Sequence, residues 1–202
     1  MPQLEEKRTV VSLQEKKKKG EKISAVTAYD FPTAAAASEA GIDLILVGDS
    51  LGMVLQGHAN TLKVTMAEMV YHTSMVARAE PLSLVVSDMP FQSYHISVEQ
   101  AVENAVRLVK EGAAEAVKLE GGAKRFKVIE AILDADIPVL AHLGLTPQSV
   151  HKFGGFKVQG KLKSRAEEIL QDAAALEKLG VFAIVLESIP MELAAKITGT
   201  IS

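Results

Sequence analysis

Polar or ionisable residues end each of six short apolar runs in this chain, and they are the residues whose types could carry out chemistry. They are Tyr29 and Asp30, Asp49 and Ser50, Asp88, Lys118 and Glu120, His142, and Glu187. A single aspartate after a strand is usually a turn residue or the cap of the next helix. A lone histidine is likewise more often a satisfied core residue. Because all six run ends share this character, we expect them to gather at one rim of a sheet.

The spacing of Lys118 and Glu120 makes the chemical interpretation more specific. Residues two apart in a strand point to the same face. A cluster of these two side chains with Asp49 and Asp88 would be costly to bury without a cation or ligand. Three carboxylates in a chain without cysteine favour a hard cation such as Mg²⁺, which takes oxygen ligands from carboxylates, water and substrate. A 2-oxo acid could fill two of its positions, and the cation would stabilise the enolate formed on proton loss. Glu187, the remaining rim carboxylate, is the candidate base.

The apolar runs themselves are rich in Val, Ile and Leu, which is typical of strands buried on both faces of a parallel sheet. The expected strands are Ile23–Ala28, Leu44–Gly48, Leu82–Ser87, Ala116–Leu119, Val139–His142 and Phe182–Leu186. Helical stretches separate them, which predicts right-handed βαβ units. A doubly wound sheet and a (β/α) barrel both fit this alternation. No Gly-x-Gly-x-x-Gly follows the first run, so a dinucleotide-binding sheet is disfavoured. In a barrel the active site lies at the carboxyl ends of the strands.

Several helix boundaries can be predicted from local signals. Three pairs have the spacing of a capping box: Thr65 with Glu68, Ser97 with Gln100, and Ser164 with Glu167. Ser12 suits the N-cap of an opening helix, whose solvated face would carry the lysine run 16–19. Pro190 suits the first turn of a last helix that runs through Ile197. Residues 151–163 predict a long loop, which could be a lid.

Composition excludes several classes of protein. The 202 residues are enough for one substantial core, so we expect a single domain over 1–202. The net charge of -3 gives no indication of nucleic-acid binding. The absence of cysteine excludes disulfides, thiolate metal sites and a cysteine nucleophile. The charged amino terminus is not a signal peptide, and no apolar run reaches the 20 or so residues that span a bilayer. We therefore expect a cytoplasmic protein without a membrane partner.

At these same residues the chain resembles the ketopantoate hydroxymethyltransferase family. The similar segments occur in family order and several are long and unusual. They are TAYD (27–30), LVGDSLGM (46–53), QGH (56–58), YHT (71–73), DMPF (88–91), VKLEGG (117–122), HLGLTPQSV (142–150), FGGFKVQG (153–160) and VLESIP (185–190).

The resemblance implies a (β/α)₈ TIM barrel of the phosphoenolpyruvate/pyruvate superfamily. It implies transfer of a hydroxymethyl group from methylene-tetrahydrofolate to 3-methyl-2-oxobutanoate, giving 2-dehydropantoate (ketopantoate) for pantothenate and coenzyme A synthesis. It also implies homo-oligomers, commonly decamers. The roles it implies are Mg²⁺ binding by Asp49, Asp88 and Glu120; oxo-acid binding by Asp49, Ser50, Asp88 and Lys118; proton abstraction by Glu187; and a pocket position for Tyr29 and His142.

Family chains continue beyond the region that matches Ile197, into two further strands and more helices. Since only six strands are counted before Ser202, we expect the barrel to be incomplete at the C-terminus. Open first and sixth strands would favour aggregation of this chain expressed alone. Two alternatives remain at this point: a fragment that is inactive and only associates with full-length subunits, or a related Mg²⁺-dependent lyase that cleaves carbon–carbon bonds in 2-oxo acids.

Overall fold

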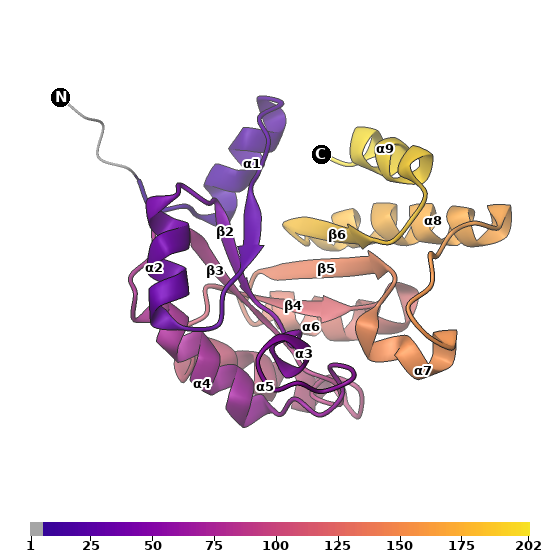
Figure 1. Ribbon diagram of the computed structural model, residues 1–202. Helices are drawn as coiled ribbons and strands as arrows, with labels where there is room; N and C mark the ends of the chain where they lie inside the picture. The colour runs from indigo at the N-terminus through magenta and orange to yellow at the C-terminus, as the bar shows by residue number, and fades with distance from the viewer. Residues whose placement is uncertain (1–5) are drawn as a thin grey trace.

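The computed structural model describes residues 6–202 and shows an α/β fold built on one six-stranded sheet (Figure 1). The strands are all parallel and lie side by side in sequence order. They are β1 (Ala25–Thr27), β2 (Leu44–Val47), β3 (Leu84–Asp88), β4 (Ala116–Glu120), β5 (Val139–Gly144) and β6 (Ala183–Glu187). The helices are α1 (Val10–Lys18), α2 (Phe31–Glu39), α3 (Leu51–Val54), α4 (Met66–Ala77), α5 (Val98–Lys110), α6 (Phe126–Asp134), α7 (Val150–Phe153), α8 (Lys163–Leu179) and α9 (Met191–Thr200), with 3₁₀ turns η1 (Ala123–Arg125) and η2 (Pro147–Ser149).

All six expected strands are present, so the predicted alternation and single parallel sheet are confirmed. Their ends differ from the prediction by one or two residues. The four later strands extend further than expected at their carboxyl ends. Asp88, Glu120 and Glu187, which were expected just after their strands, are therefore strand residues, as His142 was expected to be. These side chains therefore have the fixed direction of the pleat, which a loop would not give them.

The sheet has a different core on each face because successive side chains alternate. On the outer face, Ile45, Val85 and Val117 belong to the large core that the helices cover. Helices α2, α4, α5, α6, α8 and α9 follow one another around this face, each in contact with the next. On the inner face, Leu84 and Leu140 belong to a smaller apolar cluster.

Helix α1 covers the amino ends of the strands, on the side opposite the polar rim. Its buried Leu13 packs into the inner apolar cluster. The buried Asp43, just before β2, accepts hydrogen bonds from Arg8 at 3.0 Å, from Lys16 at 2.8 Å, and from the backbone and hydroxyl groups of Ser24 at 2.9 and 3.0 Å. Lys16 therefore anchors the helix. The prediction that it belongs to a solvated lysine face is wrong.

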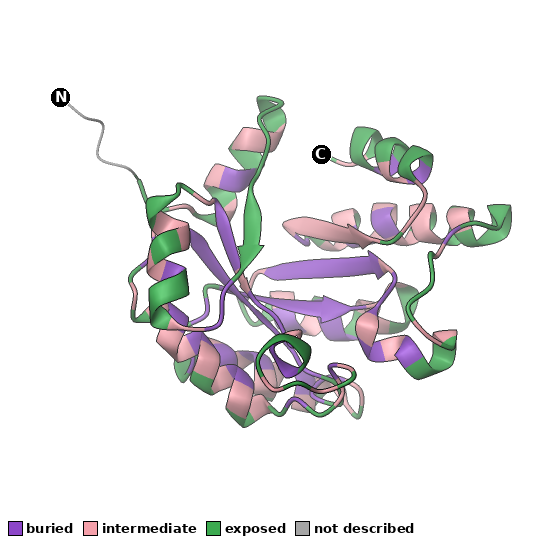
Figure 2. Ribbon diagram, in the orientation of Figure 1, coloured by how far each residue is buried: buried purple, intermediate pink, exposed green. Residues whose placement is uncertain are grey.

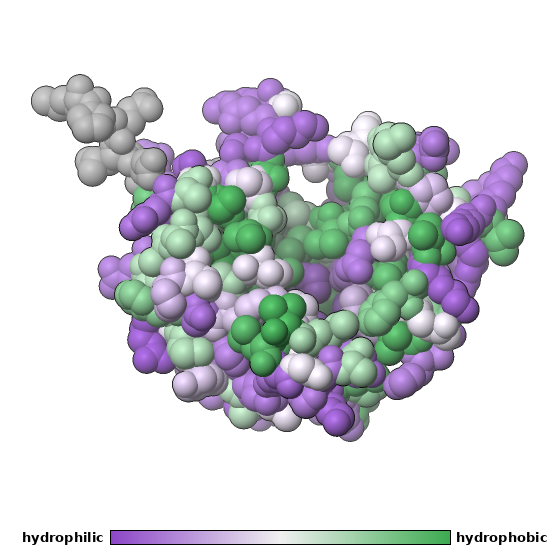
Figure 3. Space-filling view, in the orientation of Figure 1, coloured by the Kyte–Doolittle hydropathy of each residue, from purple (hydrophilic) through white to green (hydrophobic). Residues whose placement is uncertain are grey.

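Strands β1 and β6 differ from the four between them. Within residues 6–202, β1 pairs only with β2, and β6 pairs only with β5. Strand β1 is exposed and β6 is half-buried, whereas β3 and β4 are buried throughout (Figure 2). The prediction that all six strands are buried on both faces is thus wrong for these two, because each lacks a neighbour on one side. Figure 3 shows the resulting hollow, with apolar side chains on its wall.

The capping predictions were confirmed in part. Thr65 and Glu68 form a reciprocal capping box, and Ser97 accepts the backbone N–H of Gln100. The other two were wrong. Helix α8 begins at Lys163, two residues before the first position that an N-cap at Ser164 would allow, and it has no side-chain cap. Helix α1 is capped by Thr9, with Ser12 as its reciprocal partner three residues later, because Thr9 already has the extended backbone that an N-cap requires.

The predicted loop at 151–163 and the last helix also differ in detail from expectation. Part of the loop is helical, as α7, and ends at Gly154 in the left-handed conformation. Pro190 lies at the N-cap of α9, one residue before the first turn, and the helix continues past Ile197 to Thr200. Across residues 6–202, no helix combines the length and apolar character needed to cross a membrane.

Candidate active site

The predicted site residues meet at the carboxyl ends of the strands because they share the inner face of the sheet. Each site residue on β3 to β6 lies an even number of residues along its strand from an inner apolar side chain, whereas Tyr29, Asp49 and Ser50 follow the ends of β1 and β2. The pairs are Val86 and Asp88 on β3, Ala116 with Lys118 and Glu120 on β4, Leu140 and His142 on β5, and Val185 and Glu187 on β6. The inner face is thus apolar toward the amino ends and ionisable toward the carboxyl ends.

Asp49, Asp88 and Lys118 form the first half of this rim, and all three are buried. Lys118 donates a hydrogen bond to Asp88 Oδ1, and the two residues are direct neighbours in the β3–β4 register. The backbone N–H of Asp49 donates to Asp88 Oδ2 at 3.1 Å. Burial acts to lower the pKa of Lys118, but Asp88, Glu120 and Asp49 outweigh it, so the pKa is raised. Lys118 therefore stays an ammonium ion at neutral pH.

The carboxylates of this rim, if all were ionised, would carry more negative charge than Lys118 can balance. Burial, followed by the charge of Asp88, raises the pKa of Asp49 to about 7. Burial raises the pKa of Glu120 to about 8, against the opposing effect of Lys118. Buried carboxylates with one cation among them fit a site for a further positive charge.

The geometry of these carboxylates limits how such a charge could be held. No three His, Asp or Glu side chains between residues 6 and 202 converge as a ready-made metal site. Asp49 and Asp88 could each supply an oxygen ligand to an Mg²⁺ ion whose other ligands are water and substrate, which is the usual pattern for this ion.

Ser50 and Tyr29 lie beside the first half of the rim. The Tyr29 hydroxyl and Ser50 Oγ are 2.9 Å apart. A side chain at Gly48 would come within 2.7 Å of Ser50 Oγ and 3.4 Å of Asp88 Oδ2, so glycine keeps the space between them open. Asp30, by contrast, is the N-cap of α2 and accepts the backbone N–H of Thr33. Helix capping therefore accounts for Asp30, and no role at the rim is needed to explain it.

Glu120, His142 and Glu187 form the second half of the rim. His142 Nε2 lies 3.2 Å from Glu187 Oε2, and Nδ1 lies 3.8 Å from Glu120 Oε1. Neither ring nitrogen has a well-directed hydrogen bond to a described residue. Burial, followed by the charge of Lys118, lowers the pKa of His142, although Glu187 opposes this. A neutral imidazole therefore separates a buried carboxylate from Glu187, whose side chain is 40% exposed.

Gly144 sets the position of Glu187 relative to β5. The two residues are partners in the β5–β6 register, and Gly144 has a φ of +92°. A Cβ at Gly144 would lie 2.2 Å from the Glu187 carbonyl oxygen. Strand β6 can approach β5 this closely only because residue 144 has no side chain.

Two buried rim residues were missed by the sequence analysis. Gln148, in η2, and Tyr94, in the loop after β3, hydrogen-bond to each other at 2.6 Å. Gln148 also contacts both Asp49 and Glu120. Neither residue is a strand end, and the strand-end signal could not find them. Gln148 does lie within the HLGLTPQSV segment, which was the one available indication.

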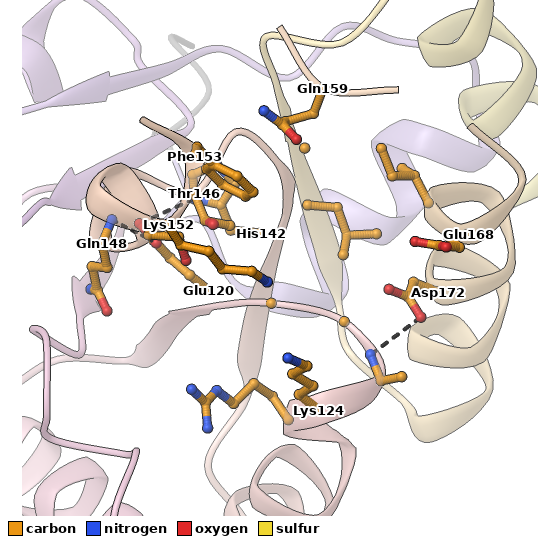
Figure 4. Close-up of a pocket in the computed structure, with 18 of the residues that line it drawn as sticks. Glu120, Lys124, His142, Thr146, Gln148, Lys152, Phe153, Gln159, Glu168 and Asp172 are labelled. Carbon is orange, nitrogen blue, oxygen red and sulfur yellow. Dashed lines mark hydrogen bonds and ion pairs between the residues drawn. The ribbon is translucent and has the colours of Figure 1, made fainter. Parts of the chain in front are cut away.

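A cavity of about 450 Å³ opens from the second half of the rim toward α8 (Figure 4). Glu120, His142 and Gln148 line its inner end, and Asp172 accepts the backbone N–H of Ala123 at its far side. Its wall also carries Lys124, Arg125, Lys152, Arg165, Glu168 and Phe153. The cavity therefore offers a mixed-charge, partly aromatic surface next to the carboxylate rim.

Sequence comparison relates the chain to one family over almost all of its length. Residues 7–202 match the family model described as ketopantoate hydroxymethyltransferase. A 3-methyl-2-oxobutanoate hydroxymethyltransferase of Thermoanaerobacter sp. (strain X514) is 58% identical over 199 residues, which cover 98% of this chain and 73% of that protein. The enzyme of the same name from Geobacter metallireducens (strain ATCC 53774 / DSM 7210 / GS-15) is 55% identical over 196 residues, covering 97% and 73%.

Solved structures with low sequence identity share the fold. A phosphonopyruvate hydrolase in complex with oxalate and Mg²⁺ superposes with a TM-score of 0.69 at 16% identity, over 93% of this chain and 67% of that one. A 2,3-dimethylmalate lyase of the PEP mutase/isocitrate lyase superfamily gives 0.66 at 19% identity, over 94% and 65%. These two comparisons support the fold alone. The family model and the two hydroxymethyltransferases go further, and on them the chain belongs to the ketopantoate hydroxymethyltransferase family.

Proposed function

We propose that this chain carries the oxo-acid site of an enzyme that transfers a hydroxymethyl group from methylene-tetrahydrofolate to 3-methyl-2-oxobutanoate, giving 2-dehydropantoate, the first step of pantothenate synthesis. The observation that supports this most directly is the rim itself. It combines a buried, charge-unbalanced Asp49–Asp88–Lys118 group with an exposed carboxylate, Glu187, held beside a neutral histidine. Family membership adds the identity of the reaction. It also weakens the lyase alternative, because the 2,3-dimethylmalate lyase is only 19% identical to this chain and supports only the fold.

Asp49 and Asp88 would hold Mg²⁺, with Glu120 in or next to its coordination shell. When bound, the ion supplies positive charge beside the keto oxygen of the substrate, where negative charge develops as the adjacent carbon loses a proton. Asp88 already has both oxygens in hydrogen bonds, to Lys118 and to the Asp49 backbone, and so has a fixed orientation. Fixed carboxylates need little reorganisation to receive a cation.

Lys118 and Ser50 would hold the oxo acid beside the two aspartates. The Lys118 ammonium is buried, and a buried positive charge attracts the substrate carboxylate more strongly than an exposed one would. The Ser50 hydroxyl, paired with Tyr29, is the neutral donor on the same side.

Glu187 would take the C3 proton of the oxo acid. It is the most exposed carboxylate of the rim, and its Oε2 lies 3.2 Å from His142 Nε2. The methylene carbon, which the folate holds through two C–N bonds, would end bonded to C3 and to a hydroxyl oxygen from water. Both C–N bonds break, and the two folate nitrogens take up one proton equivalent from C3 and one from the water. The cavity between η1, α7 and α8 is the place we assign to the folate, because it opens directly onto Glu120 and His142.

Exchange of the C3 proton of 3-methyl-2-oxobutanoate with deuterated water tests this function without folate. NMR would follow the exchange for the parent enzyme and for Glu187→Gln, with Mg²⁺ present. A general base typically contributes about 10²–10⁴-fold in rate, so we expect exchange to slow by a factor in that range. If Glu187→Gln exchanges as fast as the parent while binding the oxo acid equally well, another residue is the base.

We also propose the larger architecture that the family implies. The six strands would belong to a (β/α)₈ barrel, in which β1 and β6 gain neighbours on their open sides. Copies of the chain would form a homo-oligomer in the cytoplasm, and a decamer is the assembly that the family implies. Support for a protein contact comes from the end of α3, where Met53, Val54 and the following Leu55 are 38%, 65% and 51% exposed. Figure 3 shows apolar surface in the region of α3. Light scattering coupled to size-exclusion chromatography would measure the oligomer.

A further inference from the structure

Gln148 is the rim residue with the most contacts to the proposed metal and substrate groups, and no role has yet been given to it. Its side chain is 6% exposed and lies between the two halves of the rim. Its Nε2 donates to Asp49 Oδ2 at 2.8 Å and to the Met89 carbonyl at 3.0 Å. Its own backbone N–H donates to Glu120 Oε2 at 3.0 Å. One residue thus reaches a carboxylate after β2 and another at the end of β4.

The orientation of the Gln148 amide is fixed by its neighbours. The Tyr94 hydroxyl accepts the backbone N–H of Glu120 at 3.2 Å, so its own hydrogen is free to go to Gln148 Oε1, 2.6 Å away. Both hydrogens of Nε2 then face acceptors. A rotated amide would set its oxygen against the Asp49 carboxylate and the Met89 carbonyl, so only one orientation satisfies all the partners.

A neutral amide suits this position better than a charged side chain would. A lysine or arginine here would pair with Asp49 and compete with a divalent cation for it. A glutamate would add a further buried negative charge. The amide donates to one oxygen of Asp49, and the backbone donates to one oxygen of Glu120. The second oxygen of each carboxylate is left for a cation or its water.

We propose that Gln148, oriented by Tyr94, is a positioning residue that fixes Asp49 and Glu120 relative to each other for binding of Mg²⁺ and the oxo acid. This inference rests on the proposed function, since it assigns the cation to the same two carboxylates. It goes beyond that function by making a residue outside the strands necessary for the arrangement of the site.

The test compares Gln148→Met, Tyr94→Phe and the double variant with the parent enzyme. Methionine keeps the length of the side chain and removes all its polar contacts. Phenylalanine keeps the buried ring and removes only the hydroxyl. Gln100→Met, a partly buried glutamine on α5 outside the rim, is the matched control.

Two measurements separate positioning from a purely structural role. Calorimetry measures Mg²⁺ affinity with 3-methyl-2-oxobutanoate present, per mole of folded protein, and NMR measures folate-free C3 exchange. Loss of a partner that orients a metal ligand typically lowers metal affinity about 10–100-fold. We expect a decrease in that range for Gln148→Met and a smaller one for Tyr94→Phe. The double variant should be no worse than Gln148→Met, because both act through one amide.

The inference is overturned if Gln148→Met and Tyr94→Phe both bind Mg²⁺ within about threefold of Gln100→Met, even if they melt at a lower temperature. It is also overturned if the two substitutions lower affinity additively. Should Gln148→Met not fold, Tyr94→Phe decides by the same criterion. A parent enzyme that binds Mg²⁺ and oxo acid but shows no C3 exchange would contradict the proposed function instead, and the affinity measurements would still decide the role of Gln148.

Discussion

The contribution of the buried Asp43 carboxylate to the free energy of unfolding can be predicted from its pKa. Burial alone would raise its pKa, but hydrogen bonds from Lys16, Ser24 and Arg8 outweigh burial and lower the pKa from 3.8 to about 2. Each pKa unit corresponds to about 1.4 kcal/mol, so ionised Asp43 stabilises the fold by about 2 to 3 kcal/mol at neutral pH. The group is buried and its partners are half-buried, so solvent screens little of this energy.

The sign of the pH dependence follows from the direction of the shift. A carboxyl group with a lowered pKa in the folded state contributes its full stabilisation above its unfolded pKa, here 3.8. As the pH falls below that value, the unfolded chain binds the proton first. The contribution decreases to about half by about pH 3 and is lost below about pH 2.

Asp43→Asn removes the charge and nearly keeps the shape, which makes it the variant to measure. Urea unfolding of parent and variant should differ by about 2 to 3 kcal/mol between about pH 5 and 7, and the difference should shrink toward pH 3. Comparing the two proteins cancels titration elsewhere, including the rim carboxylates. Asp134→Asn, at an exposed position at the end of α6, is the control and should change stability little at any pH. A gap for Asp43→Asn that stays constant from pH 7 to 3 would refute the charge argument and leave packing as the cause.

The remaining predictions concern the rim. Asp49→Asn or Asp88→Asn should weaken Mg²⁺ binding in calorimetry with the oxo acid present, since each removes one negative ligand while keeping its shape; unchanged affinity in both would end the metal assignment. Gly144→Ala should destabilise the fold by about 1–3 kcal/mol and slow C3 exchange, because its Cβ would meet the Glu187 carbonyl at 2.2 Å and residue 144 has a positive φ. Gly41→Ala, at a positive φ with open space around it, is the matched control for backbone strain alone. Equal exchange rates for the two alanine variants would show that β6 is not displaced.

The strand-end residues could be predicted from the sequence because two simple rules of sheet geometry apply to them. Parallel strands bring their carboxyl ends to one rim, and the period of two places Lys118 and Glu120 on one face. The register pairs Glu120 with His142. The apolar runs were strong enough to locate each strand to within two residues. The shared direction of Lys118 and Glu120 followed from their spacing, whereas the fixed direction of Asp88 and Glu187 became clear only when the structure placed them within their strands.

Other features depended on contacts that local sequence does not encode. Gln148 reaches Asp49 across 99 positions of chain, and its role depends on how η2 folds back over the rim. The N-cap of α1 is Thr9 and not the predicted Ser12. Serine is a good cap, but Thr9 is the residue with the extended backbone that a cap requires. The exposure of β1 follows from its having one neighbour within the described residues, which depends on the sheet as a whole.

Asp43 and Asp49 lie at opposite ends of β2, and their electrostatic environments differ. Asp43 receives hydrogen bonds from two cationic side chains, so the fold itself balances its charge, and its pKa is about 2. Asp49 is equally buried but shares Lys118 with other carboxylates, and its pKa is about 7. Near neutral pH, Asp49 is therefore partly protonated until a positive charge arrives. The cation that we propose there would displace the proton and supply the positive charge that balances Asp49. The fold thus balances the charge at the amino end of β2 by itself, whereas at the carboxyl end the proposed cation would do so.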